Sequence, residues 1–455
     1  MHHRKTHLLD RPGKRRRRLL APRAQGRSAP RRLASVWLTL LFLLLWAQES
    51  RAVNGLNLIG SGGMSSALAG ADTAVATDFS AMNTNPAGLT QIRGRHAGLS
   101  VGTIRPLTKF SNSRNDADGQ DNPFLIPQAG YVQHLADTPI TVGIGLFTVG
   151  GLASDYTNLR TQFGTTDKTN SQLRHYKVTP SIAYQVTENL SVGVSLAMSY
   201  SDVSLAVIPN TPGGFETLGT CNRANGMGPP GTCAFAFGFT PQYGAMYKVN
   251  DQVTLGVSYT SRVNLPFSSG KVSRNVPGVG RVTYDADVSG FKWADNLAVG
   301  VAWRPTSNLL ISYKFQWVNW DGSLNSPVLN LRNGTNPLAR NGTIILPYNW
   351  RDQYVNALGV YYEMTDKFNV HGGYNYGNNP VPKSTMDPTS ANITEHHLVG
   401  GFAYKFTPSL KLDTMATYAL ESESTYNSSR WGNNSTSQIG GYEVIFYLSW
   451  WPQAS

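Results

Sequence analysis

From His96 onward, apolar residues recur at every second position along much of the chain. This period of two is typical of a β-strand whose two faces meet different surroundings. The clearest runs are Leu190–Tyr200, Leu410–Leu420 and Tyr442–Trp450. In each run one face is mostly large and apolar, and the other is mostly small or polar. The large face would form the core of a soluble β-sandwich, whereas in a transmembrane β-barrel it would contact lipid.

Short turns and long polar stretches separate the alternating runs. Six short turns each join two such runs: Ala136–Thr138, Thr187–Asn189, Asn250–Gln252, Pro305–Asn308, Thr365–Lys367 and Thr407–Ser409. The longer stretches, which are polar and rich in Gly and Asn, are Tyr156–Leu173, Ser204–Ala234, Asp321–Asn349 and Glu421–Gln438. Short turns at one end and long loops at the other are typical of outer-membrane barrels. With both ends of the barrel on the short-turn side, six short turns predict about fourteen antiparallel strands of about 10 residues each.

The stretch that precedes these strands has a different character. Residues 53–90 are rich in Gly, Ala and Ser, almost uncharged, and do not alternate. A short helix is expected at Met64–Ala71, and the stretch has no core of its own. We therefore predict an all-β protein in which residues 95–455 form a closed transmembrane barrel. Residues 53–94 form an N-terminal segment that would need surrounding structure to bury its residues. A closed barrel leaves no unpaired strand edge, which lipid would not tolerate.

Composition agrees with a barrel rather than with a helical membrane protein. Hydrophobic residues make up 40% of the chain and charged residues only 15%, against about 25% charged residues in ordinary soluble domains. The net charge of +12 belongs to the N-terminal region. Residues 1–52 hold 13 basic and two acidic residues, whereas the remainder holds 26 basic and 25 acidic ones. We therefore expect no nucleic-acid partner.

Residues 1–52 are interpreted as a signal peptide with an extended basic n-region. Arg31 and Arg32 precede the apolar run Leu33–Ala47, which at 15 residues is shorter than the about 20 that a spanning helix needs. Ser50 and Ala52 are small residues two apart, which suits cleavage after Ala52. An uncleaved signal anchor is the alternative. No other segment reaches 18 consecutive apolar residues, so membrane association after export would come from strands.

Several short motifs follow one another along residues 55–450. They are Gly63, Ala67, Gly70, Ala71 and Ala74, then Asn85-Pro86-Ala87, then Tyr259, Ser261, Arg262 and Val263, then Arg351-Asp352-Gln353-Tyr354 with Ala357-Leu358-Gly359, and finally Tyr361-Tyr362 and Asn379-Pro380-Val381-Pro382. In this order and spacing, the chain resembles the FadL/TodX family of outer-membrane transporters for hydrophobic compounds. The resemblance implies an integral protein of the bacterial outer membrane with a fourteen-stranded barrel.

The resemblance also implies a mechanism. Residues 53–94 would form a hatch that plugs the periplasmic half of the lumen, with Asn85, Pro86 and Ala87 as its motif. Substrate would enter from the outer loops, bind inside and leave sideways at a kinked third strand, Ile140–Leu152. Gly150 and Gly151 are the candidate kink and lateral gate, because glycine in a strand commonly marks a bulge or bend. Alternatively, these glycines only fit beside a bulky neighbour.

The substrate class stays open between a long-chain fatty acid and an aromatic hydrocarbon. Family members that carry fatty acids place basic residues at positions that correspond to Val207 and Leu346, where this chain is apolar. A carboxylate would have no charge partner there, which favours a neutral substrate such as a monoaromatic hydrocarbon. Arg351 or Lys314 could supply a polar substrate contact instead. A general diffusion porin, a structural or adhesive barrel and an outer-membrane lipid hydrolase are the alternative functions.

Other candidate chemistry is sparse. Cys221 and Cys233 are the only cysteines, and after export they are expected to form a disulfide. Two cysteines without a nearby histidine supply too few ligands for a metal, and His396 and His397 would point to opposite faces of a strand. There is no His-Glu-x-x-His motif and no phosphate-binding loop, so we expect no enzyme activity and no cofactor. The expected partners are a hydrophobic substrate, outer-membrane lipid and lipopolysaccharide, and the barrel-assembly machinery; we expect a monomer.

Overall fold

The structure, a computed structural model, describes residues 53–120, 123–218 and 234–451. The expected signal peptide, Cys221 and Cys233 lie outside the described residues. None of the helices in the described part is long and apolar enough to cross a membrane.

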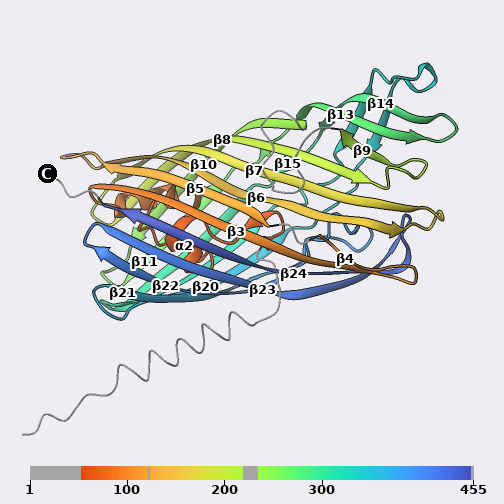
Figure 1. The fold of residues 1–455 in the computed structure, drawn as a ribbon. Coiled ribbons are helices and arrows are strands. Elements are labelled where there is room, and N and C mark those ends of the chain that lie inside the picture. Colours follow the sequence, from red (N-terminus) through yellow and green to blue (C-terminus); the bar gives the residue numbers. More distant parts are fainter. Residues whose placement is uncertain (1–52, 121–122, 219–233, 452–455) are drawn as a thin grey trace, which may run out of the picture. The chain divides into compact units, whose positions relative to one another are not determined.

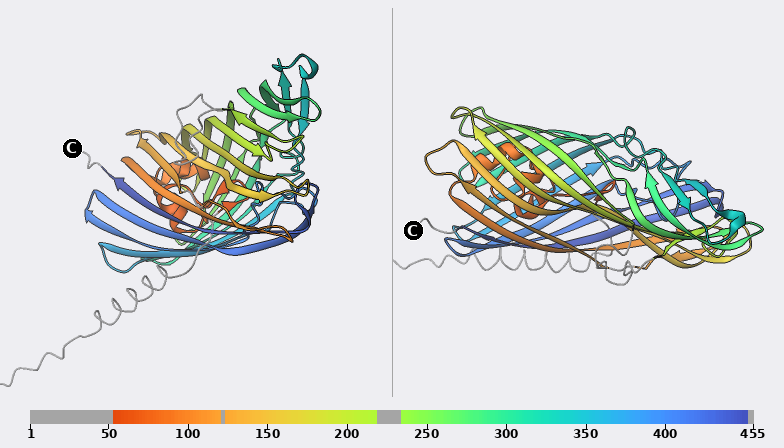
Figure 2. Two further views of the ribbon diagram at one scale, coloured as in Figure 1. Left: turned by 45° about the vertical axis from the view of Figure 1, so that its right-hand side comes forward. Right: turned by 90° about the horizontal axis from the view of Figure 1, so that it is seen from above.

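A closed antiparallel β-barrel dominates the described chain (Figures 1 and 2). Hydrogen-bonded pairs lead around the ring through β3 (Arg95–Ser111), β5 (Phe124–His134), β6 (Ile140–Arg160), β7 (Thr166–Gln185), β8 (Leu190–Val207), β10 (Ala234–Lys248), β11 (Val253–Thr260), β16 (Asn296–Thr306), β17 (Leu309–Val318), β20 (Gln353–Glu363), β21 (Phe368–Gly377), β22 (His396–Thr407), β23 (Leu410–Ser428) and β24 (Gly432–Trp450). The ring closes where β24 pairs with β3, from Trp450 opposite Ala97 to Thr436 opposite Ser111. Closure leaves the ring without a free edge.

The two faces of the wall follow the alternation in the sequence. On β8 the outward Leu196 is 49% exposed, whereas its neighbour Ser195 is 1% exposed. On β24, Phe446, Leu448 and Trp450 are exposed in the same way. Large apolar side chains therefore cover the outside, and small or polar side chains line the inside. This arrangement suits a barrel in lipid and confirms that the apolar face is not the core of a soluble sandwich.

All six short turns predicted from the sequence join consecutive ring strands. The expectation of strands of about 10 residues is wrong for β6, β7, β8, β23 and β24, which have 18 to 21 residues. Much of the expected loops Tyr156–Leu173 and Glu421–Gln438 is strand, and β6 still pairs with β7 between Arg160 and Thr166. Beyond lipid the outward face of a strand meets water, so the outward row of large apolar residues ends although the backbone pairing continues.

The sheet as a whole contains 22 strands rather than about fourteen, because eight short strands add to the strands of the ring. Short strands in the long connections pair with the ring strands or with one another at one end of the barrel. They are β4 (Asp116–Asp118), β9 (Phe215–Leu218), β13 (Phe267–Val276), β14 (Gly280–Ser289), β18 (Val328–Arg332) and β19 (Gly342–Ile345). A separate two-stranded sheet joins β12 (Val263–Asn264) to β15 (Lys292–Trp293), and a short 3-10 helix, η2, spans Pro337–Ala339.

The N-terminal segment lies inside the ring, near the short-turn end (Figure 1). Its elements are β1 (Val53–Asn54), β2 (Asn57–Leu58), α2 (Gly62–Ala67), α3 (Ala81–Thr84) and η1 (Pro86–Gln91). Phe79 and Met82 are fully buried in one cluster with Val132, Phe147 and Tyr447 of the wall. The segment, which could not form a core alone, thus shares its core with the barrel.

Candidate functional site

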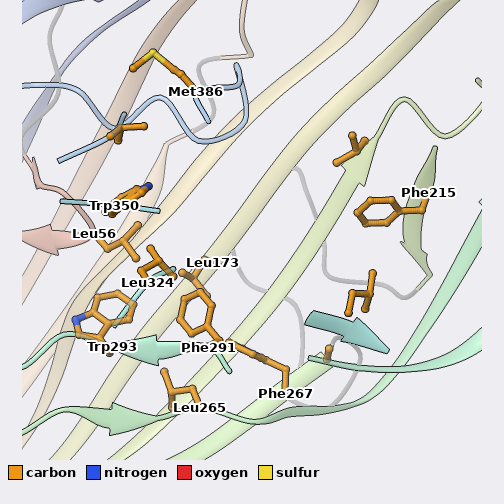
Figure 3. Close-up of a cluster of buried hydrophobic side chains, with 14 of the residues drawn as sticks. Leu56, Leu173, Phe215, Leu265, Phe267, Phe291, Trp293, Leu324, Trp350 and Met386 are labelled. Atoms are coloured by element: carbon orange, nitrogen blue, oxygen red, sulfur yellow. The ribbon is translucent and has the colours of Figure 1, made fainter. Parts of the chain in front are cut away.

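A largely apolar cavity lies inside the barrel toward the long connections. Its lining includes Phe215, Phe267, Phe291, Leu324, Leu346 and Trp350. Figure 3 shows Leu173, Phe291 and Leu324 gathered at one point of this cluster. Most of these side chains come from the starts of short strands or from turns in the long connections, so the inserted elements shape the cavity together with residues of β6, β7, β8 and β10.

The described lining of the apolar cavity offers no basic side chain to an anion. Among the described residues that line it there is no Lys, Arg or His. Asp287 at its edge accepts hydrogen bonds from Asn330 and Arg332. Burial raises the pKa of the Tyr348 phenol to about 12, so this side chain is neutral at physiological pH. The cavity therefore offers burial to an apolar molecule but no charge partner to a carboxylate.

A second cavity lies where the pairing between β5 and β6 ends. The pairing of these strands ends at Ala129 opposite Leu146, although both strands continue. The cavity is lined by Ile104, Phe124, Gly150, Leu152 and further residues. Because Leu152 and Leu173 line both this cavity and the apolar cavity, the two are adjacent through these side chains.

Gly150 and Gly151 lie where β6 leaves β5. The register between β6 and β7 shifts between Thr148 and Gly150, which marks a bulge. Gly150 pairs with Asn57 of β2, and the Gly151 amide donates to the Leu56 carbonyl at 2.9 Å. A Cβ atom at position 150 would overlap the carbonyl oxygen of Leu56. A bulge and a close approach of the Leu56 backbone therefore occur together at these glycines, and their role as kink and lateral gate stays a prediction.

The Asn85-Pro86-Ala87 motif anchors the N-terminal segment to the wall. The Asn85 side chain accepts from the Ala87 amide at 3.2 Å and so caps η1, with Pro86 at its first position. Its amide group donates to the carbonyl oxygens of Thr73 at 2.7 Å and Ala245 at 3.2 Å. Glycines 193 and 244 of the wall face this motif, and a Cβ at either would overlap it.

A polar cavity separates the N-terminal segment from part of the wall. Lys314 of β17 donates to Asp72 of the segment at 3.1 Å, and both side chains are largely buried. Asp72 also accepts a short hydrogen bond from Ser65. This pair holds the segment against the wall. Removing one partner of such a buried pair would leave an uncompensated charge.

The remaining residues singled out from the sequence are spread over the barrel. Arg351 is exposed, and its backbone amide donates to Pro380 at 2.8 Å. Val207 is buried in the large apolar cluster, and Leu346 lines the apolar cavity. Lys314 and Arg351 are not among the residues that line the apolar cavity, and their role as polar substrate contacts stays a prediction.

His396 and His397 have different surroundings in the structure. His397 is buried, whereas the ring of His396 lies against Tyr374 and Tyr376. Across the described ranges, no group of three or more His, Cys, Asp or Glu could hold a metal ion.

Sequence reasoning missed most of the cavity. Phe291, which lines the cavity, lies beside the two-residue strand Lys292–Trp293, which is too short to show a period. The available signal was an excess of aromatic residues in the polar connections, which would otherwise be unexpected in loops.

Comparison with known proteins identifies a family with this architecture. The family model described as "Outer membrane protein transport protein (OMPP1/FadL/TodX)" matches residues 45–444. A comparison with the sequences of curated proteins found no match.

Solved structures of similar fold cover 87% of this chain. The toluene transporter TodX of Pseudomonas putida has a TM-score of 0.72 at 19% identity over 100% of its own chain. The toluene transporter TbuX of Ralstonia pickettii has a TM-score of 0.68 at 22% identity over 99% of its chain. A FadL homologue of Pseudomonas aeruginosa has a TM-score of 0.69 at 15% identity over 99% of its chain. At these identities the likeness shows the fold.

The family match extends over most of the chain and agrees with the closed barrel and its apolar outer face. The chain therefore belongs to the FadL/TodX family of outer-membrane β-barrel transport proteins for hydrophobic compounds.

Proposed function

We propose that the protein takes up neutral hydrophobic molecules of the monoaromatic hydrocarbon class across the outer membrane by passive binding. The observation that carries this proposal is the apolar cavity, whose described lining holds no basic residue. An apolar solute gains about 25 cal/mol per Å² of surface that it buries there. A carboxylate would lose hydration without gaining a charge partner. Two structures of similar fold are titled toluene transporters, which supports the same class.

The route would run from the apolar cavity to the opening between β5 and β6. The adjacency of the two cavities at Leu152 and Leu173 supports this order. The bulge beside Gly150 would act as the lateral gate, through which the solute enters the membrane without crossing water. The N-terminal segment would act as a hatch that closes the short-turn end, as its burial and its bonds to the wall suggest. No covalent chemistry or fuel is needed, because movement of the segment would shift the bound population.

Equilibrium binding of radiolabelled toluene and oleate to the purified protein in detergent tests the substrate class. The proposal expects saturable toluene binding that excess unlabelled toluene displaces, and oleate binding at least tenfold weaker. Oleate binding at equal or higher affinity would assign the fatty-acid class instead. Absence of saturable binding for both would contradict transport of hydrophobic compounds through this cavity.

Replacing Leu346 with arginine should reverse the preference. A guanidinium group in the apolar cavity must keep its water, so toluene affinity should fall at least about tenfold, a change of about 1.4 kcal/mol. Oleate affinity should rise, because its carboxylate gains a partner. The matched control is Leu338→Arg, since Leu338 is 85% exposed and lies outside the cavity. Equal toluene affinity in both variants would show that the ligand binds elsewhere.

A further inference from the structure

The polar cavity beside the N-terminal segment has a chemistry that hydrocarbon transport does not use. It has a volume of about 100 Å³, and its lining includes Asp72, Thr73, Lys177, Thr240, Asn296 and Lys314. The lining is mainly polar, unlike that of the apolar cavity. Leu58 lines both this cavity and the opening between β5 and β6, so the polar cavity lies next to the proposed exit.

The fixed charges of this cavity do not balance. Lys314 is neutralised by Asp72 at 3.1 Å. Lys177 of β7 also lines the cavity and is only 7% exposed, yet its side chain has neither a hydrogen-bond nor an ion-pair partner among the described residues. Its strand neighbours across the ladder are Phe147 and Ser199, which carry no charge. One ammonium group therefore faces the cavity without compensation.

Two hydroxyl groups in the same lining also lack partners. The Oγ1 atoms of Thr73 and Thr240 are buried and make no hydrogen bond within the part of the chain that the structure describes. Buried polar groups without partners are rare and indicate a missing one. Two hydroxyl donors and an ammonium group around a small cavity form a set of donors that suits one negatively charged acceptor.

We propose that this cavity binds a single small anion at Lys177, either a halide ion or the carboxylate group of a small organic acid. Burying a lone ammonium group is strongly unfavourable unless a counter-charge accompanies it. A bound anion supplies that charge and accepts hydrogen bonds from the hydroxyl groups. The polar lining distinguishes this cavity from the apolar cavity that would bind the hydrocarbon. The site is thus separate from that of the proposed transport substrate.

Bromide is a direct probe because its anomalous X-ray scattering locates it in crystals of the full protein. Crystals soaked in sodium bromide should show an anomalous peak within hydrogen-bonding distance of the Lys177 Nζ atom. The peak should disappear in Lys177→Met, persist in Lys177→Arg and persist in Lys367→Met, which removes an exposed lysine in a short turn. No peak in the wild type, or an equal peak in Lys177→Met, would overturn the proposal.

Two further measurements test the charge balance of this site and the chemical class of its anion. Asp72→Asn removes the competing carboxylate and frees Lys314, so bromide occupancy at a given concentration should rise; an unchanged or lower occupancy would contradict an anion site. Co-soaking with benzoate distinguishes the two classes of anion. If benzoate displaces bromide, the site binds the carboxylate group of an organic acid; if the bromide peak persists, the site binds a halide ion. Toluene binding should be unchanged in Lys177→Met, because Lys177 does not line the apolar cavity. That result also shows that the variant is folded, and failure of the transport proposal would leave the bromide result unaffected.

Discussion

Replacing Gly150 with valine is expected to abolish hydrocarbon uptake while the barrel still folds. A Cβ atom at this position would overlap the Leu56 carbonyl oxygen, and the two branches of valine would extend into the cavity between β5 and β6 that Gly150 lines. Either the N-terminal segment is displaced or the opening is filled. Uptake of radiolabelled toluene by cells that produce the variant should fall to the level of cells without the protein.

The control for this experiment is Gly400→Val. Gly400 lies in a ring strand too, but a Cβ atom there would have no other atom within 4 Å. Both variants should keep the heat-dependent gel mobility of a folded barrel, and Gly150→Val should still bind toluene in detergent. Wild-type uptake by Gly150→Val would show that the solute does not leave beside this residue.

Removing residues 53–94 is expected to convert the barrel into an open channel. The segment fills the interior near the short-turn end, where Phe79, Met82 and Leu89 are fully buried. Without it the lumen would be lined by small and polar wall residues, as in a water-filled barrel. Salt conductance in a planar lipid bilayer should rise on the order of tenfold or more.

The control for the deletion is again Gly400→Val, which alters the wall but leaves the segment in place. Its conductance should remain as low as that of the wild type. A wild type that already conducts steadily would identify a general porin. A deletion variant that folds but conducts no better would defeat the hatch proposal.

The period-two pattern predicted the barrel because it reflects local physics. Whether a residue such as Leu196 or Ser195 faces lipid or the lumen depends on its position in the strand, and the sequence shows this directly. The short turns could also be predicted from the sequence, since each joins two alternating runs. Inside the barrel, the motif Asn85-Pro86-Ala87 could be recognised, but its contact with Ala245 could not.

The features that the sequence could not predict depend on contacts between distant residues. The long extensions of β6 and β23 lack the outward row of large apolar residues that marks the membrane strands, so the sequence does not separate them from loops. The close approach of the Leu56 backbone to Gly150 is visible only once β2 lies against β6. Lys177 stands in an ordinary alternating strand, and its lack of a partner emerges only when Asp72 is seen to pair with Lys314.

The most direct test of the central claim is the uptake of radiolabelled toluene by Gram-negative cells that lack transporters of this family, with and without the protein. Lipopolysaccharide slows the entry of hydrophobic solutes, so a transporter has a measurable effect on the initial rate. We predict that cells with the wild-type protein take up toluene several-fold faster than cells without it, and that unlabelled toluene competes while oleate does not. Equal initial rates in the two kinds of cells, with the barrel folded in the outer membrane, would contradict uptake of hydrocarbons by this protein.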